Sequence, residues 1–225
     1  MLERLKKVVC EQNRRLPREG LVILTEGNVS QISPDRKFML IKPSGVEYST
    51  LTPAMIVVTD MAGNVVDGKL RPSTDTATHL ELYRQFPHIG GIAHTHSTMA
   101  TTFAQRRAPI PCYGTTHADA FYGHVPVTRL MKPREIREAY EVNTGRVIAE
   151  TMQLHRSPCV LVAGHGPFAF GRDAAEAVDY ACILEKVATM ALLASPKAPI
   201  PKVLLDKHFL RKHGPDSYYG QIRNA

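Results

Sequence analysis

The chain has 225 residues, 44% of them hydrophobic, and carries a formal net charge of +7 at pH 7. This length and composition predict one globular domain with a sizeable core. No apolar run is long enough to cross a membrane, and residues 1–15 are too charged for a signal peptide, so we expect no membrane association. The basic residues are scattered, which favours a small anionic substrate over a nucleic acid, although a merely basic surface explains the charge equally well.

The first third of the chain is rich in predicted strands. Residues 1–16 carry apolar side chains at helical spacing and predict an amphipathic helix. Short β-rich segments follow, separated by Gly, Pro, Asn and Asp, and they predict strands at 21–33, 37–43, 55–60 and 64–70. A helix is expected over 73–86, because Ser73, Thr74 and Asp75 are residue types favoured at helix starts.

Strands and helices alternate in the rest of the chain. Residues 89–96 predict a buried strand that leads into a helix at 97–107, and residues 159–164 predict a second buried strand. Three more helices are expected, at 133–152 with a weak point at Gly145, at 173–194 and at about 202–213. This order of elements predicts an α/β fold, with one sheet and helices on both of its faces.

The cysteines bear on the cellular compartment. All four lie far apart and form no C-x-x-C pair: Cys10, Cys112, Cys159 and Cys182. Such spacing is typical of reduced thiols rather than of a disulfide framework. We therefore expect a cytoplasmic protein.

Two histidines, His94 and His96, end a predicted buried strand. Alternate residues of a strand point to the same face and stand roughly 6–7 Å apart, so two imidazoles at this spacing can converge on one metal ion. A third ligand is available at the end of the next buried strand, where His165 lies between Gly164 and Gly166. Three histidines with an open fourth position are typical of catalytic zinc. The alternative is that His94 and His96 are ordinary strand histidines satisfied by hydrogen bonds.

Three segments have the composition of anion-binding loops. A Gly–Asn pair and a Ser–Gly pair supply turns, and the start of the helix at 73–86 supplies free backbone N–H groups that favour phosphate. The candidate anion-binding residues are Gly27, Asn28, Lys42, Ser44, Gly45, Ser73 and Thr74. Taken singly, each segment is more often an ordinary turn or helix cap, and none matches the Gly-rich loop of nucleotide-binding proteins.

A series of motifs runs nearly the whole length of the chain: LTEGNVS, IKPSGVEYS, RPSTDTATH, FPHIGGIAHTHSTMATTFAQ, PCYGTTHADAFYG, YEVNTG, VAGHGPFAFG, LLDKHFLRKHG and YYGQ. These motifs resemble those of the class II aldolase/adducin family, and within it most closely the L-ribulose-5-phosphate 4-epimerases. The resemblance implies a single domain over 1–225, built as an αβα sandwich around a central, largely antiparallel sheet. It also implies a cytoplasmic homotetramer with active sites between subunits, in which the tail 214–225 contributes to a neighbouring subunit's site.

The same resemblance implies the ligands of a metal ion. One Zn²⁺ per subunit would be held by His94, His96 and His165, with Asp75 beside the metal. The seven candidate anion-binding residues would form the pocket for the substrate phosphate. We therefore expect a small phosphorylated ketopentose as substrate.

The resemblance further implies an acid/base pair. Asp119 and Tyr219 would serve opposite faces of the reacting carbon, with Tyr219 coming from the neighbouring subunit. Further polar positions of the epimerase site are matched by Thr115, Glu141 and His208. One position departs from the pattern, because this chain has Glu26 where epimerases often carry Trp.

The implied reaction is the interconversion of L-ribulose 5-phosphate and D-xylulose 5-phosphate by cleavage and re-formation of the C3–C4 bond. One alternative is a class II sugar-phosphate aldolase similar to L-fuculose-1-phosphate aldolase, which places Glu where this chain has Asp75. The other alternative is a non-catalytic assembly domain as in adducin, and the intact set of three histidines argues against it.

Overall fold

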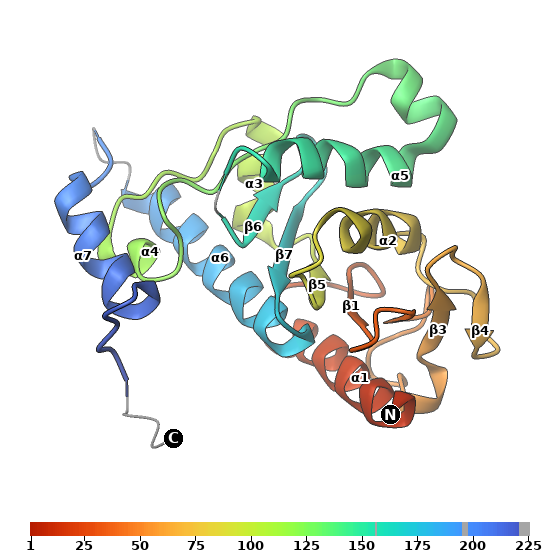
Figure 1. Ribbon diagram of the computed structural model, residues 1–225. Coiled ribbons are helices and arrows are strands. Elements are labelled where there is room, and N and C mark those ends of the chain that lie inside the picture. The colour runs from red at the N-terminus through yellow and green to blue at the C-terminus, as the bar shows by residue number, and fades with distance from the viewer. Residues whose placement is uncertain (156, 195–197, 221–225) are drawn as a thin grey trace.

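The fold is built around one antiparallel sheet. The computed structural model describes residues 1–155, 157–194 and 198–220, and in these ranges seven strands form one sheet in which every neighbouring pair is antiparallel (Figure 1). From one edge to the other the strands are β4 (Val65–Asp67), β3 (Val57–Asp60), β2 (Phe38–Ile41), β1 (Asn28–Ile32), β5 (Gly91–His94), β7 (Pro167–Gly171) and β6 (Cys159–Leu161).

Helices lie on both faces of this sheet. In chain order they are α1 (Leu2–Arg18), α2 (Thr76–Gln85), α3 (Thr98–Arg106), α4 (Thr115–Ala118), α5 (Pro133–Met152), α6 (Ala174–Ala194) and α7 (Lys202–His213), with a 3-10 helix, η1 (Pro53–Met55), before β3. Helices α1, α3 and α6 pack on one face, and α2 and α5 pack on the other (Figure 1). This αβα arrangement around an antiparallel sheet confirms the predicted fold class.

The two faces of the sheet follow from the alternation of side chains along each strand. In β5, Ile92 packs in one buried cluster with Leu80 and Tyr83 of α2. The next residue, Ala93, packs in another cluster with Ala177 of α6. Successive strand residues point to opposite faces, so a strand covered on both sides is apolar, as β5 is from Gly91 to Ala93 before it ends at His94.

Two of the strand predictions are wrong in part. The strand expected at 21–33 begins only at Asn28, because residues 21–27 form a loop in which Leu24 and Gly27 have positive φ angles of 50° and 72°. The strand expected at 159–164 ends at Leu161 and turns back into β7, which the sequence analysis does not predict.

The helix predictions hold, with two differences. Helix α5 is interrupted at Ala139, where φ is −157° and ψ is 67°, and not at the expected weak point Gly145. The side-chain amide of Asn143 donates to the carbonyl of Glu135 across this break, at 2.9 Å, so that the helix resumes at Tyr140. The short helix α4 is not predicted at all, because four residues carry no helical period.

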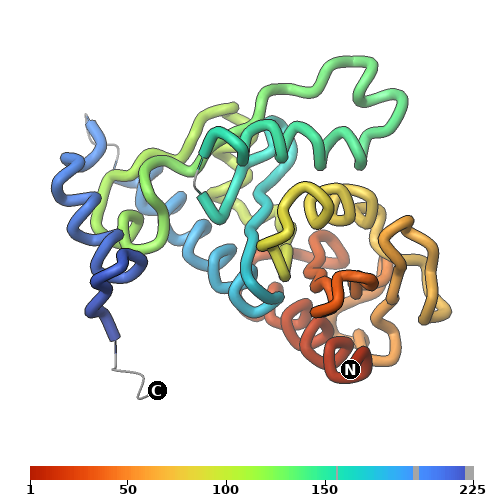
Figure 2. Tube along the Cα trace, in the orientation of Figure 1, coloured from red at the N-terminus to blue at the C-terminus, as the bar shows by residue number. Residues whose placement is uncertain are grey.

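Helix α7 packs against α4 at the end of the molecule remote from the N-terminus (Figure 2). In the part of the chain that the structure describes, no helix combines the length and apolar character that a membrane crossing requires. Residues 221–225 of the tail expected to reach a neighbouring subunit lie outside the described residues.

A buried polar side chain, Asn13, connects α1 to strand β1 by hydrogen bonds. The Asn13 amide is fully buried, donates to the carbonyls of Val9 (2.8 Å) and Val29 (2.9 Å), and accepts the N–H of Val29 (2.8 Å). Asn13→Leu keeps the volume and leaves both polar groups of Val29 without this partner. We expect it to lower the free energy of unfolding by roughly 2–4 kcal/mol, measured by urea denaturation.

The matched control is Glu11→Leu, on the exposed side of the same helix, where the change should stay within about 0.5 kcal/mol. Equal stabilities for the two variants would contradict the role assigned to Asn13.

Candidate metal centre

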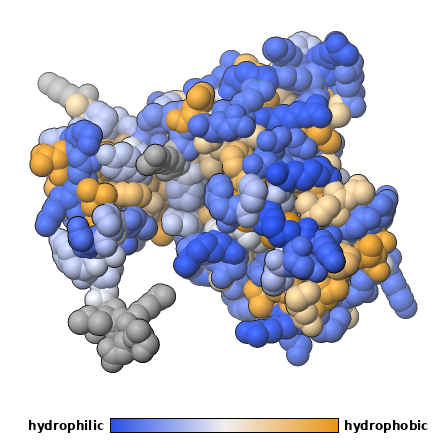
Figure 3. Space-filling model, in the orientation of Figure 1, coloured by the Kyte–Doolittle hydropathy of each residue, from blue (hydrophilic) through white to orange (hydrophobic). Residues whose placement is uncertain are grey.

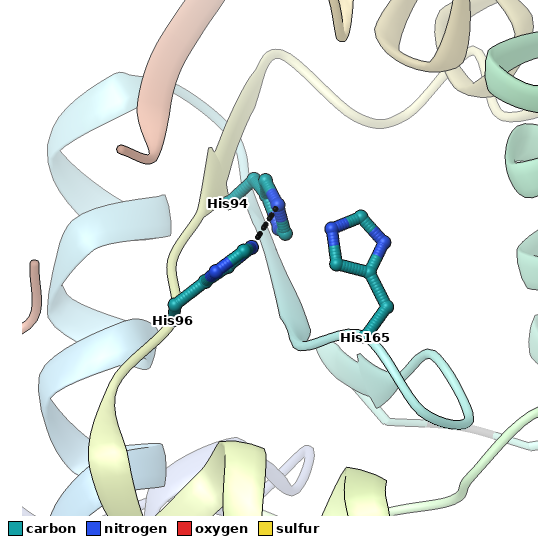
Figure 4. A group of neighbouring side chains, drawn as sticks. All are labelled: His94, His96 and His165. Atoms are coloured by element: carbon teal, nitrogen blue, oxygen red, sulfur yellow. Dashed lines mark hydrogen bonds between the residues drawn. The ribbon is translucent and has the colours of Figure 1, made fainter. Parts of the chain in front are cut away.

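Three histidines from two neighbouring strands meet at one end of the sheet. His94 is the last residue of β5, and in the antiparallel pairing with β7 it lies opposite Phe168. His96 follows the end of β5, just before α3, and His165 lies in the turn between β6 and β7. Figure 4 shows the three rings directed toward a common space, with one ring nitrogen of His165 turned toward the other two rings.

The spacing of the rings suits a single ion. One nitrogen from each of His94, His96 and His165 lies within 4.8 Å of the others, and the Nε2 atoms of His94 and His96 are 3.2 Å apart. The turn can approach this closely because it carries Gly166. A Cβ atom there would lie 2.7 Å from the carbonyl oxygen of Thr95 and 3.1 Å from the His96 ring.

The outer nitrogen of each ring faces a partner. His94 Nδ1–H donates to the carbonyl of Pro167 at 2.9 Å, which leaves the lone pair on Nε2. His165 Nδ1 lies 3.4 Å from the hydroxyl of Tyr140, the residue at which α5 resumes after its break. His96 Nδ1 lies 3.7 Å from Oε2 of Glu26. Partners of this kind fix the ring orientation and tautomer of a metal ligand.

Burial disfavours the protonated form of two of the three rings, His94 and His165. Burial lowers the pKa of His94 below its ordinary value and, together with the neighbouring histidines, lowers the pKa of His165 to about 4. A histidine must be neutral to bind a metal. Three imidazoles without a cysteine among them fit a divalent ion such as Zn²⁺ with an exchangeable position, which is the donor set of a catalytic rather than a structural site.

Beside the histidines lies a polar cluster at the start of α2. Asn28 is the register partner of His94 in β1, and its amide donates to Asp75 Oδ2 at 2.6 Å and to Ser73 Oγ at 3.2 Å. Asp75 occupies the N-cap position of α2 but makes no side-chain capping bond, so its carboxylate is directed to Asn28. Although burial opposes ionisation, His94, His79 and the Asn28 amide outweigh it and hold the pKa of Asp75 below its usual value.

This cluster also contains a buried hydrogen-bond acceptor that has no partner among the described residues. Asn28 is buried, and its Oδ1 atom has no hydrogen-bond partner among the described residues. Buried polar atoms of this kind are normally paired, so the atom marks a position where a ligand or water would bind.

The segments with the other candidate anion-binding residues lie next to this polar cluster and are joined to one another by backbone hydrogen bonds. The N–H of Ser73 donates to the carbonyl of Lys42 at 3.0 Å, and the N–H of Ser44 donates to the carbonyl of Arg71 at 3.0 Å. The side chain of Lys42 is buried, and its Nζ donates to the carbonyl of Thr25 at 3.2 Å. Burial lowers the pKa of Lys42 to about 8. The remaining candidates, Gly27, Gly45 and Thr74, lie in the same three segments.

Asp119 lies in a different environment. It immediately follows α4, and its carboxylate accepts bonds from Arg211 Nη2 (2.9 Å) and His208 Nδ1 (3.0 Å) of α7. These bonds outweigh the effect of burial and lower the pKa of Asp119. The ring of Tyr219 also lies beside cationic groups of α7, with its centroid 5.3 Å from the Arg211 guanidinium and 4.1 Å from Lys212 Nζ.

The structure therefore brings some predicted site residues together and leaves others apart. Within the described part of one chain, no contact joins Asp119 or Tyr219 to the three histidines. Thr115 begins α4, near Asp119. Glu141, on α5, accepts the Thr78 hydroxyl at its backbone carbonyl, at 2.7 Å.

Two residues at the site have no role assigned from the sequence. Tyr140 directly precedes Glu141 in the motif YEVNTG, but only the break in α5 places it beside His165. Glu26 is noted in the sequence as a departure from the epimerase pattern. Its proximity to His96 could not be predicted, because it depends on the path of the loop 21–27.

Comparisons with known proteins agree with this architecture. The family model described as Class II Aldolase and Adducin N-terminal domain matches residues 7–192. The chain is similar to a solved L-fuculose 1-phosphate aldolase, with 27% identity and a TM-score of 0.78 over 91% of this chain and 94% of that chain. It is also similar to L-fuculose-1-phosphate aldolase from Thermus thermophilus, with 24% identity and a TM-score of 0.69 over 87% of this chain and 97% of that chain. A third similar structure, L-fuculose 1-phosphate aldolase from Glaciozyma antarctica, has 20% identity and a TM-score of 0.77 over 96% of this chain and 84% of that chain.

The three-histidine arrangement makes a direct prediction about metal content. The purified protein should carry about one zinc ion per chain, and His96→Ala should lose most of it after dialysis against buffer, because two imidazoles bind far more weakly than three. Elemental analysis of the dialysed proteins measures the difference.

His88→Ala is the matched control, since His88 is exposed and, among the described residues, makes only a ring contact with Phe86. Retention of a full complement of zinc by His96→Ala would show that the metal binds elsewhere.

Proposed function

The chain belongs to the class II aldolase and adducin family, and from this premise we propose that it is a zinc-dependent L-ribulose-5-phosphate 4-epimerase. The observation that carries the proposal is the position of Asp75. Its carboxylate lies at the start of α2, held by the Asn28 amide at 2.6 Å, next to the strand that carries His94. A short carboxylate held in this way is less able to reach a substrate as a base than the Glu that the family's aldolases place there.

The reaction needs a route around a poorly acidic hydrogen. The C4–H bond of a ketopentose phosphate is not adjacent to the C2 carbonyl, so simple proton removal is unfavourable. In the proposed route the C3–C4 bond breaks, its electron pair stays with C3, and the proton of the C4 hydroxyl leaves as C4 becomes an aldehyde. Zn²⁺ bound to the three histidines would act as a Lewis acid that stabilises the negative charge of the three-carbon fragment.

The residues of the chain would then control the two-carbon fragment. Asn28, Ser44 and Ser73 would hold its phosphate, while Lys42 supplies a positive charge to the same pocket. The aldehyde turns about its anchored phosphate and presents its other face. C3 attacks that face, the C3–C4 bond re-forms, and the C4 oxygen takes a proton.

This route needs one proton acceptor and one proton donor on opposite sides of C4. We assign these roles to Asp119, which its contacts to Arg211 and His208 keep ionised, and to Tyr219. Each chain would contribute its own Asp119, and Tyr219, which makes no contact with the histidines of its own chain in the described structure, would come from a neighbouring subunit of a homotetramer.

The surface of α7 supports an assembly of this kind. The helix has no buried residue within the chain and exposes Val203, Leu204 and Leu210. Figure 3 shows hydrophobic side chains at the end of the molecule that α7 occupies. The free cysteines agree with the reducing environment of the cytoplasm, where we place the enzyme.

A sugar-phosphate aldolase is the second candidate function. It is favoured by the 27% identity to an L-fuculose 1-phosphate aldolase over nearly the full length of both chains. An aldolase would release the two fragments that an epimerase must retain.

Incubation of the zinc-loaded protein with L-ribulose 5-phosphate separates the two candidates. We expect D-xylulose 5-phosphate, followed by NMR, and a much slower reaction with unphosphorylated L-ribulose, because the phosphate anchors the fragment. Lys42→Ala should raise KM more than it lowers kcat, since it removes an interaction present in both ground and transition states.

Cleavage of L-fuculose 1-phosphate, with no conversion of L-ribulose 5-phosphate, would establish the aldolase instead. Equal turnover of phosphorylated and unphosphorylated ribulose would contradict the phosphate pocket.

The shared site makes a separate prediction. Asp119→Asn and Tyr219→Phe should each lose most epimerase activity and still bind zinc, because neither change touches the histidines. Mixing the two variants under conditions of subunit exchange should restore part of the activity, since some sites then combine an intact Asp119 with an intact Tyr219. Formation of mixed oligomers, checked by native mass spectrometry, with no recovery of activity would contradict a site shared between subunits.

A further inference from the structure

The loop 21–27 brings a carboxylate to the outer side of the histidine cluster. Glu26 Oε2 lies 3.7 Å from Nδ1 of His96, while Nε2 of the same ring faces His94 at 3.2 Å. The other carboxylate oxygen, Oε1, accepts the N–H of Ile23 at 3.2 Å. The carboxylate is therefore held at one oxygen by its own loop and directed toward His96 with the other.

The backbone that carries Glu26 is fixed from three directions. The buried Tyr48 donates its hydroxyl to the carbonyls of Glu26 (2.7 Å) and Gly27 (2.9 Å). Lys42 donates to the carbonyl of Thr25, and Gly27 has a φ of 72° at a point where a Cβ would lie 2.9 Å from the carbonyl oxygen of His94. The loop is thus packed directly against the strand that carries the metal ligands.

The tautomer of His96 decides whether the cluster can accept an ion. If Nε2 carries the proton, it can donate to His94 Nε2, whose own Nδ1 proton is engaged by Pro167, and His96 then has no lone pair directed into the cluster. If Nδ1 carries the proton, both Nε2 lone pairs face the same space. A carboxylate beside Nδ1 favours the second arrangement, because it attracts the N–H and repels a lone pair.

From this geometry we infer that Glu26 is a positioning residue for His96. Its carboxylate attracts the Nδ1–H group of His96, so that the lone pair of the ring lies on Nε2 and faces the metal. Glu26 does for His96 what the carbonyl of Pro167 does for His94. The inference rests on the metal centre of the proposed function but does not depend on which sugar phosphate is the substrate.

Metal affinity tests the inference without reference to activity. Zn²⁺ binding to the metal-free protein is measured by competition with a chromophoric chelator, for the natural chain and for Glu26→Gln. The amide keeps the shape and can still accept the Ile23 N–H, so folding should be preserved. We expect the dissociation constant for Zn²⁺ to rise about 10- to 100-fold, the range found when such a carboxylate partner is removed.

Glu47→Gln is the matched control, because it removes one negative charge from an exposed residue that has no contact with the histidines in the described structure. Its Zn²⁺ affinity should be unchanged. Glu26→Asp, with the same charge and a shorter reach, should lie between Glu26→Gln and the natural chain. The thermal midpoints of the metal-free proteins should be equal.

Three outcomes would overturn the inference. One is a Glu26→Gln affinity within a factor of about two of the natural chain, which is far below the effect expected for a lost ligand partner. Another is an equal weakening by Glu47→Gln, which would reveal a general effect of charge. If Glu26→Gln lowered the thermal midpoint, the Glu26→Asp variant would decide, and natural Zn²⁺ affinity in that variant would reject the role of Glu26.

Failure of the natural chain to bind Zn²⁺ would instead contradict the metal centre itself. Normal Zn²⁺ binding without epimerase activity would reject only the proposed function.

Discussion

The pairing of β5 with β7 is the constraint on which the site depends. The register runs from Gly91 opposite Gly171 to His94 opposite Phe168, and the rings of His94 and Phe168 stack with centroids 4.1 Å apart. A shift by one residue would turn His94 to the face covered by α6, because strand side chains alternate between faces. The pairing also places the turn with His165 next to the end of β5, so one ladder brings all three histidines together.

The other neighbour of β5 places the polar cluster beside the metal centre. In the pairing with β1, Asn28 lies opposite His94, and residues directly opposite each other in an antiparallel pair share a face. The Asn28 amide also donates hydrogen bonds to Asp75 and Ser73 at the start of α2, which connects that helix to the pair formed by Asn28 and His94. The proposed metal ligand His94 and the proposed phosphate-binding residue Asn28 thus lie on adjacent strands at the same end of the sheet, which is the arrangement needed to hold two parts of one small substrate.

The features predicted from the sequence are those encoded by short-range patterns. The spacing of His94 and His96, the glycines around His165 and the cap residues before α2 each act over a few residues, and the structure brings the three histidines together as expected. One sheet with helices on both faces could also be predicted, because buried strands and amphipathic helices have distinct periods, whereas the antiparallel order of the strands is expected only from the family resemblance.

The features that sequence reasoning misses depend on tertiary structure. The turn after Leu161 gives no strand period of its own, so the sequence does not predict β7, and the break at Ala139 lies in a segment of ordinary helix-forming composition. The contact of Glu26 with His96 joins residues 70 positions apart in sequence through a loop where the sequence predicts a strand. Asp119 and Tyr219 stay predictions, because their roles require contacts between chains.

We propose that three imidazoles bind one metal ion through Nε2 and leave a position open for substrate. X-ray absorption at the zinc K-edge of the metal-loaded protein tests it most directly. We expect three imidazole nitrogens at about 2.0–2.1 Å from the zinc, together with an oxygen ligand that changes when a sugar phosphate is added. A closed shell containing sulfur, or a spectrum that does not respond to the sugar phosphate, would contradict it.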